Sequence, residues 1–229
     1  MSVPLQGISS MATRQVLAEL LLAWQARSGD IVHLESVGGV SAAQRVRAGE
    51  AFDLAFLASD AIDSLIADGH VLGGSRVDLM RSSTVVAVPA HGSVPSIHTE
   101  EALRRAVLQA AAIGYSTGPS DVALQKLFER WAIAEQIQAR VVKPPPGVPV
   151  GSLLARGEVS LGFQQLSELM HVPDVRIVGP LPAAIAIDTV FSAGVVRGSA
   201  NADAAQRLLA FLASPEAEPA KCRQGMGPV

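Results

Sequence analysis

The sequence is poor in cysteine, in aromatic residues and in charge, and each shortage excludes a class of protein. Among its 229 residues Cys222 is the one cysteine, which excludes an intramolecular disulfide and a metal site built from several cysteines. Aromatic residues make up 4% of the chain, too few for the stacking platforms that bind single-stranded nucleic acids. The 18 basic residues face 21 acidic ones and form no basic stripe, so we expect no nucleic-acid partner.

Long apolar runs are also missing. A helix that spans a bilayer needs about 20 consecutive apolar residues. The longest apolar stretches here, such as Val85–Pro89 and Ala183–Ile187, have the length of strands. The first ten residues lack the cationic start and the apolar core of a secretion signal. We therefore expect no membrane span and a cytoplasmic location, or a periplasmic one if the sequence is a processed form.

Several sequence motifs that identify nucleotide-binding proteins, hydrolases or zinc sites are absent. The chain has no Gly-x-x-x-x-Gly-Lys-Ser/Thr loop and no Gly-x-Gly-x-x-Gly, so nucleotide binding is not supported. It has no Gly-x-Ser-x-Gly elbow, which argues against an α/β-hydrolase. The five histidines are scattered, without the i, i+4 spacing of a zinc-binding helix. We expect neither a metal site nor a cofactor.

The residues that are present alternate between short strand-like runs and helical patterns, in a chain that is 49% hydrophobic. This alternation predicts an α/β fold with parallel sheets covered by helices on both faces. We expect strands at residues 3–8, 31–37, 52–58, 83–89, 113–116, 159–164, 175–178 and 189–196. We expect helices at residues 11–27, 42–48, 62–68, 99–112, 121–131, 150–156 and 201–213.

Three of the expected strand-to-helix junctions combine glycine with small hydroxyl residues: Ser9-Ser10, Gly38–Ser41 and Ser116–Ser120. The first turn of a helix has free backbone N–H groups and a partial positive charge. Glycine lets a ligand approach the backbone, and serine adds a hydroxyl donor. Three such ends together predict an anion site without lysine or arginine. A plain capping role for each serine is the open alternative.

Four runs, in order along the chain, resemble segments of the molybdate-binding proteins of ABC importers. The runs are Phe52–Ser59, the segment 63–77, Ala155–Phe163 and Phe211–Ala217. They cover nearly the whole chain, and their order carries the resemblance. A further likeness is to the branch of this group that contains aconitate isomerase. It rests on Tyr115–Ser120 and Gly162–Leu169, followed by Val-Gly-Pro-Leu-Pro at 178–182.

The resemblance implies a type II periplasmic-binding-protein fold. This is α/β, with two Rossmann-like lobes of mixed, mainly parallel sheets joined by a two-segment hinge. Lobe one would hold residues 1–80 and 190–229, and lobe two residues 81–189, with the ligand in the cleft between them. The family's ligand loops fall on Ser9, Ser10, Gly39, Ser41, Tyr115, Ser116, Gly118 and the loop near Pro146–Val150, with Ser120 just beyond.

One departure from the molybdate binders bears on the ligand. They have a tyrosine where this chain has Gln165, which follows Gln164. An amide both donates and accepts, so it suits a carboxylate better than a bare oxyanion. The likeness to aconitate isomerase likewise implies an organic acid as ligand and an allylic proton shift as a possible reaction.

That reaction would need a base, and the weak candidates are Glu35, His33 and Tyr115. We expect Glu35 and His33 on opposite faces of their strand, so that at most one faces the ligand. Arg81 is a candidate partner for a carboxylate. Asp53 and Asp188 are expected to be structural and to tie strand ends.

Three functions stay open at this point: a protein that binds a small anion, an isomerase of unsaturated acids on the same fold, and a cytoplasmic ligand sensor. An ABC permease would be a partner only if a signal sequence had been removed.

Overall fold

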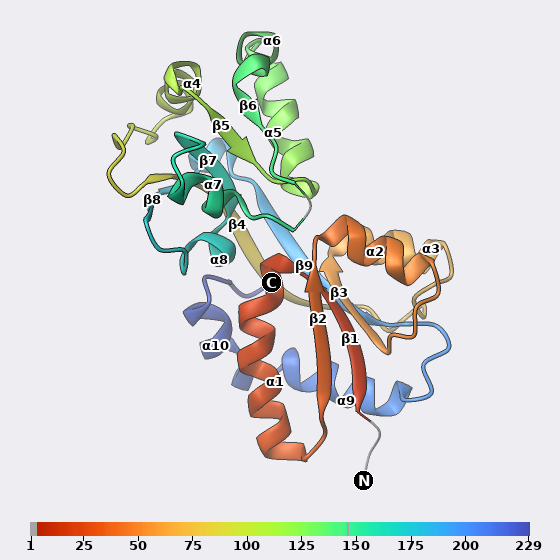
Figure 1. Ribbon diagram of the computed structural model, residues 1–229. Coiled ribbons are helices and arrows are strands. Elements are labelled where there is room, and N and C mark those ends of the chain that lie inside the picture. The colour runs from red at the N-terminus through yellow and green to blue at the C-terminus, as the bar shows by residue number, and fades with distance from the viewer. Residues whose placement is uncertain (1–3, 146) are drawn as a thin grey trace. The chain divides into compact units, whose positions relative to one another are not determined.

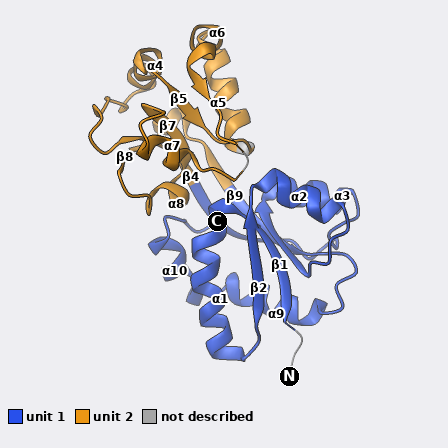
Figure 2. Cartoon of the chain, in the orientation of Figure 1, with its two compact units in different colours: residues 1–82, 190–229 blue, residues 83–189 orange. Residues whose placement is uncertain are grey.

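The computed structural model describes residues 4–145 and 147–229, without the side chain of residue 119 (Figure 1). The predictions that fall on Val3 and Pro146 therefore lie outside the described residues. The chain divides into two compact units (Figure 2). Unit 1 comprises residues 1–82 and 190–229, and unit 2 comprises residues 83–189. Two long strands pass from one unit into the other: β4 (Val77–Pro89) and β9 (Asp188–Val195).

Unit 1 is a mixed sheet with helices on both faces. Besides parts of β4 and β9, its elements are β1 (Leu5–Ser10), η1 (Met11–Thr13), α1 (Arg14–Ser28), β2 (Val32–Val37), α2 (Gly39–Arg47), β3 (Leu54–Ala58), α3 (Ser59–Ala67), α9 (Ala202–Leu212), η4 (Pro215–Ala217) and α10 (Glu218–Arg223). β1 pairs in parallel with β2 and β3, and β3 pairs antiparallel with β9.

The alternation of side chains along β3 builds two cores in unit 1. Phe56 packs with α1, α9 and α10, whereas its neighbours Ala55 and Leu57 pack with α2 and α3. Successive residues of a strand point to opposite faces, so each face of the sheet receives its own layer of helices. Because β1 to β3 are parallel, their carboxyl ends reach the same edge of the sheet.

Unit 2 repeats this plan with other elements. Besides parts of β4 and β9, they are α4 (Glu100–Gln109), β5 (Ile113–Tyr115), α5 (Pro119–Arg130), α6 (Ala134–Ile137), η2 (Gln138–Arg140), β6 (Val141–Val142), α7 (Val150–Ala155), β7 (Leu161–Gln165), α8 (Leu166–Leu169), β8 (Val175–Pro180) and η3 (Ala183–Ile185). β5 pairs in parallel with β6 and β7, and β4 pairs antiparallel with β7 and β8.

The two faces of the unit 2 sheet are covered by different helices. Val86 and Phe163 pack with α4, α5 and α6, whereas Val85 and Ala87 pack with α7 and Leu169 of α8. The predicted α/β class with mixed, mainly parallel sheets is confirmed. Within the described residues, no helix is both long enough and apolar enough to cross a membrane.

Among the expected boundaries that were wrong, two lie close to predicted site residues. α2 begins at Gly39 instead of residue 42, so Ser41 lies in the first helical turn and not in the loop before it. First-turn N–H groups need no partner inside the helix, so a glycine there costs little. β4 begins at Val77 instead of residue 83. The charged residues Asp78 and Arg81, both exposed, interrupt its early part and concealed it.

Two polar ties close unit 1. The buried carboxylate of Asp53 accepts hydrogen bonds from Gln6 N (2.8 Å), Ser199 Oγ (2.5 Å) and Asn201 Nδ2 (3.2 Å), as expected for a residue that ties strand ends. Near the carboxyl terminus, Gly227 and Arg81 exchange two backbone hydrogen bonds of 2.9 and 2.7 Å. The tail is thereby fixed to β4 next to the unit boundary.

Candidate functional site

In unit 1 the carboxyl end of β1 presents two buried serines. Ser9 lies opposite Ser36 of β2, and their hydroxyl oxygens are 2.8 Å apart. Ser9 Oγ also lies 3.2 Å from the carbonyl oxygen of Ser10, to which Thr13 Oγ1 donates as well, at 3.1 Å. The hydroxyl of Ser9 is therefore satisfied by the protein itself.

Ser10 differs from Ser9 in this respect. It is 7% exposed, and its Oγ has no hydrogen-bond partner among the described residues. A Cβ added to Gly39, the first residue of α2, would lie 3.6 Å from Ser10 Cβ, so the start of α2 adjoins this serine. No side chain caps α2. An unpartnered hydroxyl beside an uncapped helix start is an arrangement that suits an anion.

A lack of partners alone does not mark a ligand site. Trp24 Nε1, on α1, is also buried with no hydrogen-bond partner in the described part of the chain. What distinguishes Ser10 is its place at the carboxyl end of a central parallel strand, where ligands of open α/β sheets usually bind.

The two candidate bases on β2 lie on one face, so the expectation that they point to opposite faces was wrong. Residues two apart in a strand share a face, and His33 and Glu35 are both exposed. Both carboxylate oxygens of Glu35 accept hydrogen bonds from Arg45, at 2.5 and 2.9 Å. These bonds lower the pKa of Glu35. A carboxylate held in this way is a weak proton acceptor.

In unit 2 the junction of β5 and α5 places hydroxyl groups and a charged pair at one helix start. Gly118, with a φ of 146° that favours glycine, precedes α5. Ser120 and Asp121 of the first turn are buried, whereas Ser116 is half-buried. Asp121 Oδ1 accepts from Gln125 Nε2 at 2.5 Å, and Lys143 Nζ lies 3.4 Å from both Asp121 oxygens.

Tyr115 is the last residue of β5 and directly precedes this junction. Its ring packs edge-on against Phe128, with centroids 6.0 Å apart, and Lys143 Nζ lies 5.2 Å from its centroid on the ring face. Burial, and secondarily the negative charge of Asp121, raises the pKa of the Tyr115 hydroxyl. Tyr115 therefore keeps its proton at neutral pH and serves as a donor, not as a base.

Gln165 is the last residue of β7, and one of the two polar atoms of its side-chain amide has a hydrogen-bond partner among the described residues. Its side chain is 6% exposed, and Nε2 donates to Thr189 Oγ1 at 2.9 Å, while Oε1 has no partner among the described residues. Thr84, its cross-strand neighbour on β4, is 1% exposed and its Oγ1 is likewise unpartnered. Neighbouring unpartnered groups in a buried place call for a ligand or a water that supplies the missing bonds.

Gln164, the other predicted amide, points to the opposite face. Its Oε1 accepts from the backbone N–H of Gly151 at 3.2 Å, and its Nε2 donates to Glu168 Oε1 at 2.9 Å. Both ends of this amide are occupied inside unit 2. The predicted pair of ligand-binding amides therefore separates into one with a free atom, Gln165, and one without, Gln164.

Glu168 was not predicted as a site residue. The residue keeps some exposed surface, but protein atoms surround its carboxyl group. Burial raises its pKa to about 7, partly offset by the hydrogen bond from Gln164. The signal in the sequence was the spacing of four residues from Gln164, which is weak because a strand ends and a helix begins between the two.

Arg81 lies one residue before the end of the unit 1 part of β4. Its side chain is exposed and makes no ion pair within the described residues. Its contact with a carboxylate ligand stays a prediction.

Three further residues at the unit 2 site were not predicted: Lys143, Thr84 and Thr189. Their role follows from strand pairing, which no local pattern indicates.

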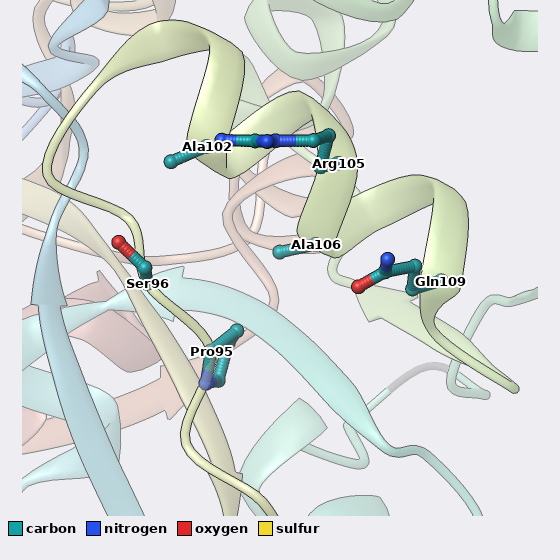
Figure 3. Close-up of a pocket in the computed structure, with 6 residues that line it drawn as sticks. All are labelled: Pro95, Ser96, Ala102, Arg105, Ala106 and Gln109. Atoms are coloured by element: carbon teal, nitrogen blue, oxygen red, sulfur yellow. The ribbon is translucent and has the colours of Figure 1, made fainter.

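One surface pocket lies elsewhere in unit 2 (Figure 3). It has a volume of about 250 Å³ and lies between α4 and the loop before it, lined by Pro95, Ser96, Ala102, Arg105, Ala106 and Gln109. It contains none of the predicted site residues. In the described part of the chain, no cluster of three or more His, Cys, Asp or Glu side chains could hold a metal ion.

Comparison with known proteins adds to this geometry. The model of a family described as bacterial extracellular solute-binding protein matches residues 5–227. Aconitate isomerase of a Pseudomonas species is 35% identical, over 97% of this chain and 87% of that protein.

Solved structures agree on the fold. The periplasmic molybdate-binding protein of Azotobacter vinelandii matches with a TM-score of 0.80 and 20% identity, over 97% of this chain and 98% of that one. The tungstate ABC transporter structure from Geobacter sulfurreducens matches with a TM-score of 0.78 and 17% identity, over 96% and 98%. At such identities the likeness shows the fold alone.

Proposed function

The chain belongs to the family of bacterial extracellular solute-binding proteins, and from this premise we propose that it binds a small organic acid in its anionic form. The observation that carries the proposal is the buried amide of Gln165, which has one free hydrogen-bonding atom at the end of β7. Leaving such a group without a partner costs about 1–3 kcal/mol, a cost that a ligand removes.

The unit 1 residues support the anionic part of the proposal. The hydroxyl of Ser10 can donate a hydrogen bond, and the first turn of α2 offers backbone N–H donors and a partial positive charge to a ligand. They carry no specificity for one kind of anion, since a tetrahedral oxyanion and a carboxylate both accept hydrogen bonds.

The unit 2 residues support the organic part. A free amide atom beside the hydroxyls of Thr84 and Thr189 suits a ligand that both donates and accepts, such as a hydroxyl or carboxyl group. Lys143 adds a cation close to Tyr115. Contact of one ligand with residues of both units, and with Arg81, stays a prediction that variants in each unit test.

A second candidate function is isomerisation of an unsaturated carboxylic acid. The observation that favours it is the 35% identity to aconitate isomerase over 97% of this chain. A base would remove a proton from a carbon next to the double bond, and the proton would return to another carbon of the allylic unit, with no net change in composition. Tyr115 would donate to the enolate oxygen.

The predicted bases do not support this reaction equally. The ion pair to Arg45 weakens Glu35, and the raised pKa of Tyr115 keeps its proton in place. His33 is exposed on the same face as Glu35. Isomerisation is therefore the second candidate function. Measured conversion of a substrate would make it the first.

A ligand screen with a turnover assay separates the two functions. Thermal shifts are measured with molybdate, tungstate, sulfate, citrate and both geometric isomers of aconitate. A ligand at a hundredfold its dissociation constant stabilises the fold by about 2.7 kcal/mol. We expect shifts with the organic acids. Shifts with molybdate or tungstate alone would refute the proposal.

Proton NMR of the same samples then shows whether aconitate changes isomer. Conversion that is lost in a Gln165→Leu variant would make the protein an isomerase. Binding without conversion would leave a receptor. The location of the protein and a permease partner stay untested.

A further inference from the structure

A chain of two hydrogen bonds links α8 to the start of α7 in unit 2. The backbone N–H of Gly151 donates to Gln164 Oε1 at 3.2 Å, and Gln164 Nε2 donates to Glu168 Oε1 at 2.9 Å. Gly151 also packs closely. A Cβ added there would lie 2.9 Å from Val172 Cγ2 and 3.2 Å from Leu169 Cδ2. The turn that opens α7 therefore lies against α8 and the residues after it.

Within the described residues, no cation forms an ion pair with the Glu168 carboxyl, and no positive charge contributes to its pKa shift. α7, β7 and the unit 2 part of β4 contain no titratable side chain. β8 contributes Arg176, which is exposed, and His171 follows α8, also exposed. Arg156, just after α7, is paired with Glu158 at 2.5 Å. Burial and the single bond from Gln164 therefore govern the protonation of Glu168.

We propose that Glu168 is a proton-binding switch, which through Gln164 sets how firmly the turn at the start of α7 is held. An ionised carboxylate accepts only, so it fixes the Gln164 amide with its nitrogen toward Glu168 and its oxygen toward Gly151. The bond is then charge-assisted and polarises the second bond of the chain.

Protonation weakens this arrangement. A neutral carboxyl group accepts less strongly, and its O–H competes to donate to the Gln164 oxygen that holds Gly151. The hold on the α7 turn is thus firm when Glu168 is ionised and loose when it carries a proton. Its midpoint lies near neutral pH, since burial raises the pKa of Glu168 to about 7.

The switch bears on the ligand because the loop before α7 is one of the predicted ligand loops. This step rests on the proposed function. An ordered loop leaves less conformational entropy to lose on binding, so anion affinity should be higher at pH 8 than at pH 6. In a Glu168→Gln variant that difference should vanish.

Two-dimensional NMR of the free protein tests the switch without any ligand. The Gly151 amide signal is followed from pH 5 to pH 9. We expect one titration step near pH 7 in the wild type and none in Glu168→Gln, which keeps the acceptor but loses the ionisation. Glu158→Gln, which removes an exposed carboxylate of the same unit, is the matched control and should keep the step.

Two results would overturn the proposal: a flat Gly151 signal in the wild type, or a step that persists in Glu168→Gln. A step that disappears in His171→Gln but not in Glu168→Gln would assign the effect to the histidine. If Glu168→Gln fails to fold, the carboxyl carbon shift of Glu168 in the wild type gives its titration directly. A midpoint below pH 5 would then refute the switch.

The ligand arm uses aconitate as probe, with its affinity measured at pH 6 and pH 8. If the Gly151 signal titrates but aconitate binds equally well at both pH values, the switch stands and the contact between the loop before α7 and the ligand is refuted. A flat signal would refute the switch whatever the binding shows.

Discussion

The polar ends of the two sheets differ in the chemistry that they offer. In unit 1, Ser9, Ser10 and the start of α2 present hydroxyls and backbone N–H groups, none of which titrates near neutral pH. In unit 2, burial raises the pKa of Glu168, which lies near the end of β7, to about 7. Under the proposals above, unit 1 supplies anion binding independent of pH, whereas unit 2 supplies selectivity and its regulation.

The units also treat a buried carboxyl group differently. Asp53 of unit 1 receives three hydrogen bonds, whereas Glu168 of unit 2 receives one from a described residue. The three bonds make Asp53 a structural tie, whereas burial raises the pKa of Glu168 to about 7. Five substitutions, apart from their controls, test these differences between the units.

The largest effect is expected from Asp53→Ala. The substitution leaves Gln6 N, Ser199 Oγ and Asn201 Nδ2 without their acceptor. We expect the free energy of unfolding to fall by about 3 kcal/mol or more, measured by urea denaturation. Asp188→Ala, which removes an exposed aspartate, is the control and should change it by less than about 0.5 kcal/mol. Equal effects would contradict the role of Asp53 as a tie.

The next effect concerns pH and Glu168. Its pKa is about 7 in the fold and near 4.5 as an ordinary glutamate. The folded state therefore binds this proton more tightly, and the resulting stability is complete below about pH 4.5 and lost as pH rises through about 7. The wild type should lose at most about 3 kcal/mol relative to Glu168→Gln over this range, and less where solvent reaches the side chain.

Chemical denaturation of both proteins at pH 5, 6, 7 and 8 measures that difference. Both proteins share all other ionisable groups, such as Glu35, whose pKa lies below its usual range. The effects of those groups on the unfolding free energy therefore cancel in the difference. A difference that stays constant across the series would show that Glu168 is ionised throughout.

A smaller effect is expected from Gln165→Leu on ligand affinity. The leucine removes the amide and leaves no free hydrogen-bonding atom at the end of β7. We expect aconitate to bind about thirtyfold more weakly by isothermal titration calorimetry, or about 2 kcal/mol. Gln109→Leu, in the surface pocket on α4, is the control and should bind normally.

The smallest effect is expected from two adjacent serines. Ser9 has hydrogen bonds within the protein and Ser10 Oγ has none. Ser9→Ala should lower the unfolding free energy by about 1 kcal/mol, whereas Ser10→Ala should leave it unchanged or slightly higher. Ser10→Ala should instead weaken aconitate binding by about tenfold. The reverse pattern would remove Ser10 from the ligand site.

Much of the fold could be predicted because local patterns agree with the packing. The run 52–58 predicted β3, whose five residues are all buried, and the apolar face from Val16 to Trp24 predicted α1. Where polar residues interrupt a strand, as at Asp78 in β4, the pattern failed. The register with Gly227 and the bond from Ser192 Oγ to Asp78 that support this part of the strand are long-range.

The candidate site was less accessible to prediction. Ser10 and Gln165 came from strand ends and family resemblance, but their free atoms could not be foreseen. Whether Gln165 is satisfied depends on Thr189, 24 residues away, and on the pairing with Thr84. The pKa of Glu168 depends on the burial of its carboxyl group, which arises only when α7 and α8 pack on β7.

The pairing of Gly227 with Arg81 has a practical consequence for protein engineering. Both backbone groups of Gly227 are engaged with Arg81. An affinity tag or fluorescent fusion joined close behind Gly227 needs a flexible spacer, so that it does not disturb the pairing with β4. Cutting the chain before Gly227 would free both backbone groups of Arg81, so a protein shortened in this way is a poor choice for a binding assay.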